Sequence, residues 1–457
     1  MSQLPRQRSP PVRWRGPWPS RWGAALLVVC HLALLLSHDL AARPGLTFTI
    51  LSVAFLALAW AVFGAREFGF SAVGILAVAL GLRVLFLPLA PTLSDDVLRY
   101  LWDGKVVGTG ANPYALTPDA EVLSALRDSE WERMPHRDVE AVYPPLALAL
   151  FSIAAALPRS LLVWKVFLVT FELAGCWLLL RLASALGIEL RRVALYAWNP
   201  LVTLEVAGMG HVDALGVTLV IGTVWALEHR RGWAPLAAAA SVLVKLVPII
   251  ALPLWARRSP RGGVFLALSL VVVAAALAPV WVTTGGVPPG WVRFGISWEF
   301  NGPLYEPLWR ALDASGLDGA IKGTLDRLKT WTGEHELWNR FYPYVYPQLM
   351  AKAALGLLLA GLLWRAWRDR ETGVVEATGR TFAALVICSA TVYPWYLLWL
   401  LPWAALSCQR AWLGLSALIL LSYLPQVASL PLMPWVFLSI WLPFAVLLWR
   451  YRSWSTT

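Results

Sequence analysis

Two adjacent carboxylates stand out in the stretch SDDVLRYLWDGKVVGTGANPYALTP, residues 94–118. Asp95 and Asp96 follow directly on an apolar run, residues 71–90, that is long enough to cross a membrane. A carboxylate beside a membrane can remove a proton from a sugar hydroxyl while a lipid-linked donor lies in the bilayer, and two carboxylates can also share a divalent cation. Acids in the first turn of a helix equally stabilise its start. The stretch predicts a catalytic carboxylate, Asp95 or Asp96, with a divalent cation optional.

Three further side chains can balance negative charge near those carboxylates. Lys245 lies in the middle of the apolar run SVLVKLVPIIALP, where an ammonium either snorkels to the membrane surface or neutralises an anion such as a lipid phosphate. His211 lies in the string GMGHVDAL between two apolar runs, where ionisable groups usually face a cavity or a partner. Arg99 follows the acidic pair by one helical turn and can instead hold an Asp ionised. We expect Lys245, His211 and Arg99, in falling order, to bind a donor phosphate.

A second group of polar and aromatic side chains is expected to contact the substrates. The string SATVYPWYLLWLLPWAAL, residues 389–406, concentrates aromatic rings that either form an interfacial belt or lie beside a sugar. The outer segment FNGPLYE, residues 300–306, is a candidate for closing over the site. The predicted substrate-binding residues are Tyr100, Asn112, Tyr114, Asp213, Tyr393, Trp395 and Tyr396.

Membrane-spanning helices must position these residues. Of the 457 residues 58% are hydrophobic and 14% are charged, with a mean hydropathy of +0.62, whereas a soluble domain has about 25% charged residues. The predicted fold is an all-α polytopic membrane bundle of about 11–14 transmembrane helices. The apolar runs lie at residues 22–37, 45–64, 71–90, 143–157, 160–187, 191–208, 212–229, 233–255, 262–282, 346–367, 379–393, 395–407, 411–430 and 433–450. Pro248 predicts a re-entrant pair of half-helices, which membranes tolerate where the backbone lines a cavity.

The charged residues predict the topology. Residues 1–21 carry five arginines and no acid, which places this basic tail in the cytoplasm. Three crossings then put a large first loop, residues 91–142, outside, and this loop holds ten of the 27 acidic residues but five of the 38 lysines and arginines. We expect one membrane domain at residues 22–450, a second outer loop at 283–345 and a cytoplasmic tail at 451–457. The net charge of +11 is scattered at the ends of apolar runs, so it does not predict nucleic-acid binding.

Several strings occur together in an order that is typical of one enzyme family. They are SDDVLRYLWDGKVVGTGANPYALTP, VYPPLA, WNPLVTLEVAGMGHVDAL, LVKLVPIIALPL and YPWYLLWLLP, over about residues 75–410. In this order the chain resembles the GT-C superfamily of membrane glycosyltransferases, and within it glycosyltransferase family 87 and the bacterial polyprenol-phosphate-mannose-dependent α-mannosyltransferases. The chain departs from the family's GHND-like string at Val212, so a contact that depends on that asparagine is not expected.

The resemblance implies a GT-C-type bundle with a large first external loop and an Asp of that loop, Asp95 or Asp96, as general base. It implies a polyprenyl-phosphate sugar, most often mannose, as donor, an inverted linkage in the product, and no obligatory metal. The implied partners are this donor, a glycolipid or glycan acceptor and the lipid bilayer. The implied location is a bacterial inner (plasma) membrane, with the active site on the periplasmic or extracellular side.

Two other classes of protein use a similar set of residues. A transporter or lipid flippase also has a polar cavity and broken helices, but it usually shows internal pseudo-symmetry, which this sequence lacks. An O-antigen-type polymerase or ligase of lipid-linked glycans also has a large outer loop, and would depend on residues such as His136 and Arg137 in it. The adjacent carboxylates favour the glycosyltransferase.

Overall fold

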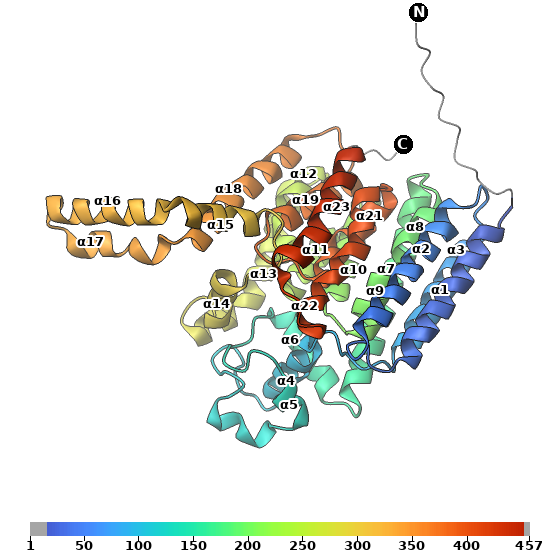
Figure 1. The fold of residues 1–457 in the computed structure, drawn as a ribbon, viewed down its shortest axis with the longest axis horizontal. Coiled ribbons are helices and arrows are strands. Elements are labelled where there is room, and N and C mark those ends of the chain that lie inside the picture. Colours follow the sequence, from blue (N-terminus) through green and yellow to red (C-terminus); the bar gives the residue numbers. More distant parts are fainter. Residues whose placement is uncertain (1–15, 452–457) are drawn as a thin grey trace, which may run out of the picture.

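The computed structural model describes residues 16–451, and helices dominate this part of the chain (Figure 1). The ends of the two predicted tails, residues 1–15 and 452–457, lie outside the described residues. Within residues 16–451 the extended backbone pairings are two isolated bridges, from Phe300 and from Asn301 to Thr391. The predicted all-α class is therefore confirmed.

Within the described residues, six helical segments are long and apolar enough to cross a membrane. They are α1 (Trp18–Leu36), α2 (Pro44–Phe63), α7 (Ser160–Ala185), α13 (Gly262–Thr284), α18 (Pro347–Arg368) and Leu432–Arg450, which joins η7 (Leu432–Val436) to α23 (Phe437–Arg450). Shorter helices pack among them: α3 (Ala72–Phe86), α6 (Pro145–Ala155), α10 (Asp213–Glu228), α11 (Ala234–Val244) and α19 (Val374–Cys388). The chain is an integral membrane protein, as the sequence predicts.

Fewer helices are long than the sequence predicts, because several expected spans break part-way. The broken spans are α8 (Leu190–Ala197) with α9 (Pro200–Thr203) and η2 (Leu204–Gly208); α11 with η3 (Val247–Ala251) and α12 (Leu252–Arg258); α19 with η5 (Pro394–Trp399) and α20 (Leu401–Leu406); and α21 (Arg410–Leu418) with η6 (Ile419–Tyr423) and α22 (Leu424–Val427). Pro200, Pro248 and Pro394 lie just after the first three breaks. Proline lacks an amide hydrogen and clashes with the preceding helical turn, so it ends a helix there.

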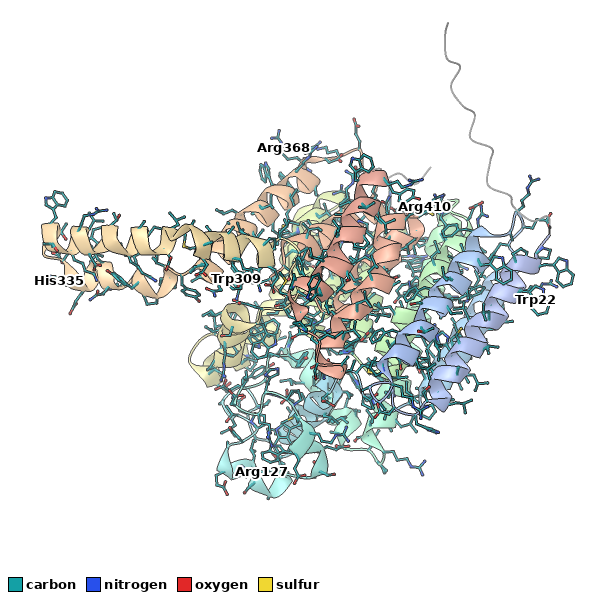
Figure 2. All side chains as sticks on the ribbon, viewed as in Figure 1. Trp22, Arg127, Trp309, His335, Arg368 and Arg410 are labelled. Carbon is teal, nitrogen blue, oxygen red and sulfur yellow. The ribbon has the colours of Figure 1, made fainter. Side chains whose placement is uncertain are left out.

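After the break that follows α11, the chain runs back to the end of the bundle at which α11 begins. Arg230 and Arg257 line one cavity together with Asp369, although a complete crossing between them would put the two arginines at opposite ends. Arg368 lies at this end of the bundle and Arg127 at the other (Figure 2). α11 and α12 therefore form the re-entrant pair that the sequence predicts.

The two predicted outer loops contain helices of their own. The first holds α4 (Asp96–Gly108), η1 (Glu121–Leu126) and α5 (Ser129–Arg133), and the second holds α14 (Pro289–Ser297), α15 (Tyr305–Ser315), α16 (Leu317–Thr332), α17 (His335–Asn339) and η4 (Tyr342–Tyr344). α16 is the longest helix of the second loop and is amphipathic. α16 and α17 extend as an arm away from the bundle, with His335 at its tip (Figures 1 and 2).

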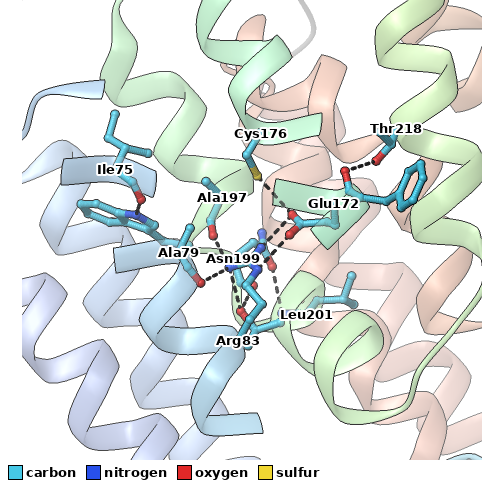
Figure 3. A network of polar contacts seen from close by, with 12 residues as sticks. Ile75, Ala79, Arg83, Glu172, Cys176, Ala197, Asn199, Leu201 and Thr218 are labelled. Carbon is cyan, nitrogen blue, oxygen red and sulfur yellow. Dashed lines mark hydrogen bonds and ion pairs between the residues drawn. The ribbon is translucent and has the colours of Figure 1, made fainter. Parts of the chain in front are cut away.

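A buried ion pair satisfies the backbone where α8 breaks. Arg83 on α3 donates from Nε and Nη2 to the carboxylate of Glu172 on α7, at 3.0 and 2.8 Å, and both side chains are fully buried. Arg83 Nη1 also donates to the carbonyl of Ala197 at the end of α8 (Figure 3). Asn199 caps α9 by accepting from the amide of Leu201 at 3.0 Å. These contacts pair polar groups that would otherwise be costly to bury in an apolar bundle.

A second buried cation holds the end of α3. Lys165 on α7 donates from Nζ to the carbonyls of Phe86, Leu87 and Leu89, at 3.4, 3.2 and 2.6 Å. The last carbonyls of a helix have no partner within the helix, and a basic side chain can satisfy them. This contact fixes the place at which the chain leaves α3 for α4.

Removing one partner of the Arg83–Glu172 pair is expected to destabilise the bundle. Arg83→Met leaves Glu172 buried and uncompensated, which costs about 3–5 kcal/mol, so the midpoint of unfolding in detergent micelles should fall clearly. Asp318→Asn is the control, because Asp318 pairs with Lys322 at 3.0 Å on the exposed arm, and it should leave the midpoint unchanged. Equal midpoints for the two variants would contradict this role of Arg83.

Candidate active site

One cavity of about 710 Å³ brings the predicted charged residues together. Asp95, Asp96 and Arg99 line it from the start of α4, and Lys245 lines it from the break after α11. The aromatic residues of the predicted set that also line it are Tyr393, Trp395 and Tyr396. The base candidates and the first-ranked cation candidate therefore share one space, although Asp96 and Lys245 are far apart in the sequence.

Three helix breaks meet at the floor of this cavity. Lys245 has extended backbone angles at the end of α11, and its Nζ donates to both carboxylate oxygens of Asp213 at 2.7 and 2.9 Å. Asp213 is fully buried in the first turn of α10, where the helix dipole favours a carboxylate. Trp399, in the break after α19, donates from Nε1 to Asp213 Oδ1 at 2.6 Å. Asp213 lies behind the cavity lining, and its contacts fix the position of Lys245.

The two adjacent carboxylates have different surroundings. Burial raises the pKa of Asp95, and Arg133 in the first outer loop lowers it. Burial raises the pKa of Asp96 to about 6, although the positive charge of Lys245 opposes this shift. Asp96 Oδ2 lies 4.0 Å from His211 Nδ1, and the Asp96 side chain keeps 32% of its surface exposed. Asp96 is thus the carboxylate that faces the cation, and at neutral pH a group with this pKa is ionised and still basic.

Four stacked rings form one wall of the site. Phe300 lies on Tyr393, Tyr393 on Trp395 and Trp395 on His211, with ring centroids 4.6, 4.5 and 3.9 Å apart and interplanar angles of 16°, 2° and 15°. The Phe300 carbonyl accepts from the amide of Val392 at 2.7 Å, which fastens the outer segment to this wall. Within the segment FNGPLYE it is Phe300 that lines the cavity, and closure of the whole segment over the site stays a prediction. His211 lies behind Trp395, outside the cavity lining.

Arg99 serves the first outer loop as well as the cavity. Its Nε donates to Asp103 Oδ1 at 2.8 Å, and its two terminal nitrogens donate to the carbonyls of His136 and Val139 at 2.9 and 2.7 Å. All three nitrogens of the guanidinium are engaged by the protein. Arg99 thereby fastens the far part of the loop over α4.

The remaining predicted residues of the first loop lie outside the cavity lining. Tyr100 Oη lies 3.3 Å from His211 Nδ1, behind Asp96 on α4. Asn112 accepts from the amide of Tyr114 at 3.0 Å, and Tyr114 Oη donates to the carbonyl of Tyr143 at 2.7 Å. In this structure Asn112 and Tyr114 shape the turn that leads back to α6.

Several residues of the site did not enter the predicted set. Tyr143 lines the cavity, but in the sequence its position before two prolines indicates only the start of a helix. Glu205 carried a signal, because it is a carboxylate in an apolar run. Its partner, Tyr423, gave no such signal in the sequence. Tyr423 donates from Oη to both Glu205 oxygens, at 3.1 and 3.0 Å, although the two residues are 218 positions apart. A tyrosine in an apolar run is too common for its spacing to reveal such a contact.

The acidic residues of the site are not gathered as metal ligands. Across residues 16–451, no group of three or more His, Cys, Asp or Glu side chains is placed to hold a metal ion. Asp213 is held by Lys245, and Glu205 by Tyr423. The optional divalent cation at Asp95 and Asp96 stays a prediction.

Comparison with known proteins identifies the family. The family described as α-(1→6)-mannopyranosyltransferase, N-terminal domain, matches residues 20–261, and glycosyltransferase family 87 matches residues 141–394. Each match spans more than half of the chain. The chain belongs to glycosyltransferase family 87. The MptB C-terminal domain also matches this family 87 member, at residues 345–452.

A curated relative of this family 87 chain is α-(1→6)-mannopyranosyltransferase A of Corynebacterium glutamicum. The two are 25% identical over 343 residues, which are 67% of this chain and 65% of the relative. The chain thus matches just under two thirds of the relative's length. No solved structure matches the chain at a significant level. The family that the sequence motifs suggest is confirmed.

Close packing at Gly216 on α10 keeps Trp399 against Asp213. A Cβ at Gly216 would lie 2.3 Å from Cη2 of Trp399, so Gly216→Ala must displace the indole. We expect this variant to lower the thermal unfolding midpoint. Gly222→Ala on the same helix is the matched control, because the nearest atoms would lie 3.8 Å away, and alanine favours a helix. If Gly216→Ala is as stable as this control, the packing of Trp399 is not as tight as described.

Proposed function

We propose that this chain transfers mannose from a polyprenyl-phosphate donor to a glycolipid or glycan acceptor, with inversion at the anomeric carbon. One observation carries the proposal: Asp96 and Lys245 line the same cavity. A single displacement needs a base for the acceptor hydroxyl and a positive charge for the leaving phosphate. Membership of glycosyltransferase family 87 supports sugar transfer, and the name of the Corynebacterium glutamicum relative supports α-(1→6)-mannosyl transfer.

The reaction proceeds in one displacement. Asp96 takes the proton of the acceptor hydroxyl, and the hydroxyl oxygen forms a bond to the anomeric carbon. The bond from that carbon to the phosphate oxygen breaks, and its electron pair leaves with the polyprenyl phosphate. Attack from the side opposite the phosphate converts a β-linked donor into an α-linked product.

Lys245 is suited to the leaving phosphate because its own position is fixed. Asp213 accepts two of its hydrogen bonds, and an ammonium has three hydrogens, so one remains for the phosphate. Nζ also lies 4.7 Å from the centre of the Tyr396 ring, a distance that suits a cation–π contact. An ammonium held in this way meets the new negative charge without having to move.

The side of the cavity next to α18 suits the polyprenyl chain. Leu355, Gly356 and Leu359 line it from α18, and Leu385 and Val386 line it from α19. These side chains carry no charge, and a Cβ at Gly356 would meet no atom within 4 Å. Lys352 of α18 also lines the cavity, but its charge is paired with Glu299 at 3.0 Å. An apolar chain entering between the two helices therefore reaches the cavity while its phosphate points toward the cation.

The outer face of the membrane is the proposed location of the reaction. The acidic first loop carries Asp96, whereas the basic segment at residues 364–370 lies at the other end of the bundle. Basic segments remain in the cytoplasm during membrane insertion. A polyprenyl-phosphate sugar and a glycan acceptor therefore meet at the periplasmic or extracellular side.

Replacing each carboxylate tests the assignment of the base. Asp96→Asn should lower kcat by about 100-fold or more, since general-base catalysis contributes about 10²–10⁴-fold. Asp95→Asn is the matched control, with the same chemical change one residue away, and should lower kcat much less. The assay follows transfer from polyprenyl-phosphate-mannose to a glycolipid acceptor, with the unfolding midpoint as a check of folding. Near-normal rates for Asp96→Asn would reject the proposed base.

The pH dependence of kcat/KM tests the same assignment independently. Burial raises the pKa of Asp96 to about 6, and the base acts in its ionised form, so kcat/KM should fall as the pH drops through about 6. Lys245→Met removes a positive charge that lowers this pKa, so the acidic limb should move to higher pH as well as lose rate. An acidic limb that stays in place in Lys245→Met would contradict the coupling of these two residues.

A further inference from the structure

A buried carboxylate, Glu205 in η2, lies behind the base, and His211 follows it on the turn that connects η2 to α10. Glu205 and His211 are both fully buried, and Glu205 Oε2 lies 3.2 Å from His211 Nε2, which makes no hydrogen bond of good geometry within residues 16–451. Tyr423 donates from Oη to both oxygens of Glu205. None of these three residues makes an ion pair with Lys245, which is held by Asp213. The function proposed above leaves this carboxylate without a role.

The backbone of the turn holds Glu205 and His211 in a fixed relation. Residues 204–208 form a π-turn, and the amide of His211 donates to the carbonyl of Glu205 at 2.9 Å. Gly210 has φ +79°, and its carbonyl accepts from Trp164 Nε1 at 2.9 Å. A Cβ at Gly210 would also lie 3.2 Å from Val97 on α4. Only glycine fits this left-handed position without strain, and π-turns of this kind are frequent at functional sites.

The opposite edge of the His211 ring faces α4. Nδ1 lies 3.3 Å from Tyr100 Oη and 4.0 Å from Asp96 Oδ2. Trp395 covers one face of the imidazole, which separates it from the cavity. His211 is therefore placed to act on Asp96 and Tyr100, and it has no open path to a donor phosphate.

The protonation of the Glu205–His211 pair determines whether the edge of the imidazole that faces α4 carries a hydrogen. A carboxylate beside an imidazole in a buried site is most stable when the pair has no net charge, because uncompensated buried charge is costly. A neutral pair that shares its proton across the contact between Oε2 and Nε2 is either a carboxylic acid that faces an unprotonated Nε2 or a carboxylate that faces an imidazolium. In both forms the remaining hydrogen of the ring is on Nδ1, so Nδ1 is a donor on the edge that faces Asp96.

We propose that Glu205 is a positioning residue for the transfer reaction, which shares one proton with the facing His211 Nε2 and thereby keeps a hydrogen on Nδ1, at the edge of the ring that faces Asp96 and Tyr100. This inference rests on the proposed function, because it assigns Asp96 as the base. It gives His211 a role different from the phosphate contact that its sequence position predicts. A donor on Nδ1 stabilises the ionised form of Asp96 and fixes its orientation.

Other charged groups around Asp96 also shift its pKa. Lys245 and Arg99 favour its ionised form, whereas Asp213 and Asp95 disfavour it. None of these four groups is changed by a substitution at Glu205. Glu205 itself also interacts electrostatically with Asp96, and the loss of its negative charge would move the acidic limb to lower pH. A limb that moves to higher pH in a Glu205 variant therefore reports on the hydrogen at His211 Nδ1.

Two substitutions at Glu205 separate the proposed role from packing. Glu205→Leu removes every hydrogen-bonding group, which leaves the imidazole free to carry its hydrogen on Nε2 instead. We expect kcat to fall by roughly 10–100-fold, the usual cost of losing a partner that orients a reacting group. We also expect the acidic limb of kcat/KM to move to higher pH, with the donor KM little changed. Glu205→Gln can still donate from its amide to Nε2, so it should keep the limb near its original pH and retain more activity.

A control variant shows what a purely structural loss looks like. Glu172→Gln weakens the buried pair with Arg83, away from Asp96, and should lower the unfolding midpoint while leaving the pH of the acidic limb unchanged. If Glu205→Leu folds poorly, Tyr423→Phe provides the test, because it removes one hydroxyl from Glu205 and should move the limb in the same direction by a smaller amount.

The outcomes distinguish this inference from the function on which it rests. An acidic limb that moves up in Glu205→Leu, and less in Glu205→Gln, supports the role of Glu205. If Asp96→Asn is inactive but the limb of Glu205→Leu stays in place, the proposed function stands and the inference is rejected. An active Asp96→Asn rejects both.

Discussion

The contact on which the site depends is the ion pair between Lys245 and Asp213. It joins the break after α11 to the start of α10, and Trp399 adds the break after α19 through its bond to the same carboxylate. A lone ammonium in an apolar bundle would be costly to bury, and so would a lone carboxylate. Each charge therefore offsets the cost of burying the other, and together the two side chains hold three interrupted helices at one point. The cavity exists because these helices stop there.

The interrupted helices in turn need partners for their free backbone groups, and buried cations provide them. Arg83 pairs with Glu172 and donates to the carbonyl at the end of α8, and Lys165 donates to three carbonyls at the end of α3. A broken helix at membrane depth is stable only where such groups are satisfied by protein or face a cavity. The bundle around the site is therefore rigid, which suits groups that must be preorganised around a reacting sugar.

The proposed reaction divides its tasks among separate elements. The first outer loop carries the base, the re-entrant pair carries the cation, and the segment after α19 carries the ring wall. The outer segment at Phe300 extends this wall by stacking on Tyr393. The turn that holds Glu205 and His211 reaches Asp96 from behind, so substrate meets the carboxylate while the protein controls its other side. Asp95 and Asp96 differ in role because only Asp96 faces both Lys245 and His211.

Local signals in the sequence were enough to establish the membrane class, the family and most of the charged residues of the site, because apolar runs, helix-breaking prolines and intramembrane charges are all visible without a structure. Pro248 in its apolar run was enough to predict a broken, re-entrant segment. Packing of the bundle, in contrast, turned Asp96 toward Lys245 and His211, placed His211 behind Trp395 and brought Tyr423 to Glu205. Those relations depend on which helix faces which, across as many as 218 residues. Local spacing does not encode such contacts, since packing of the whole bundle sets them.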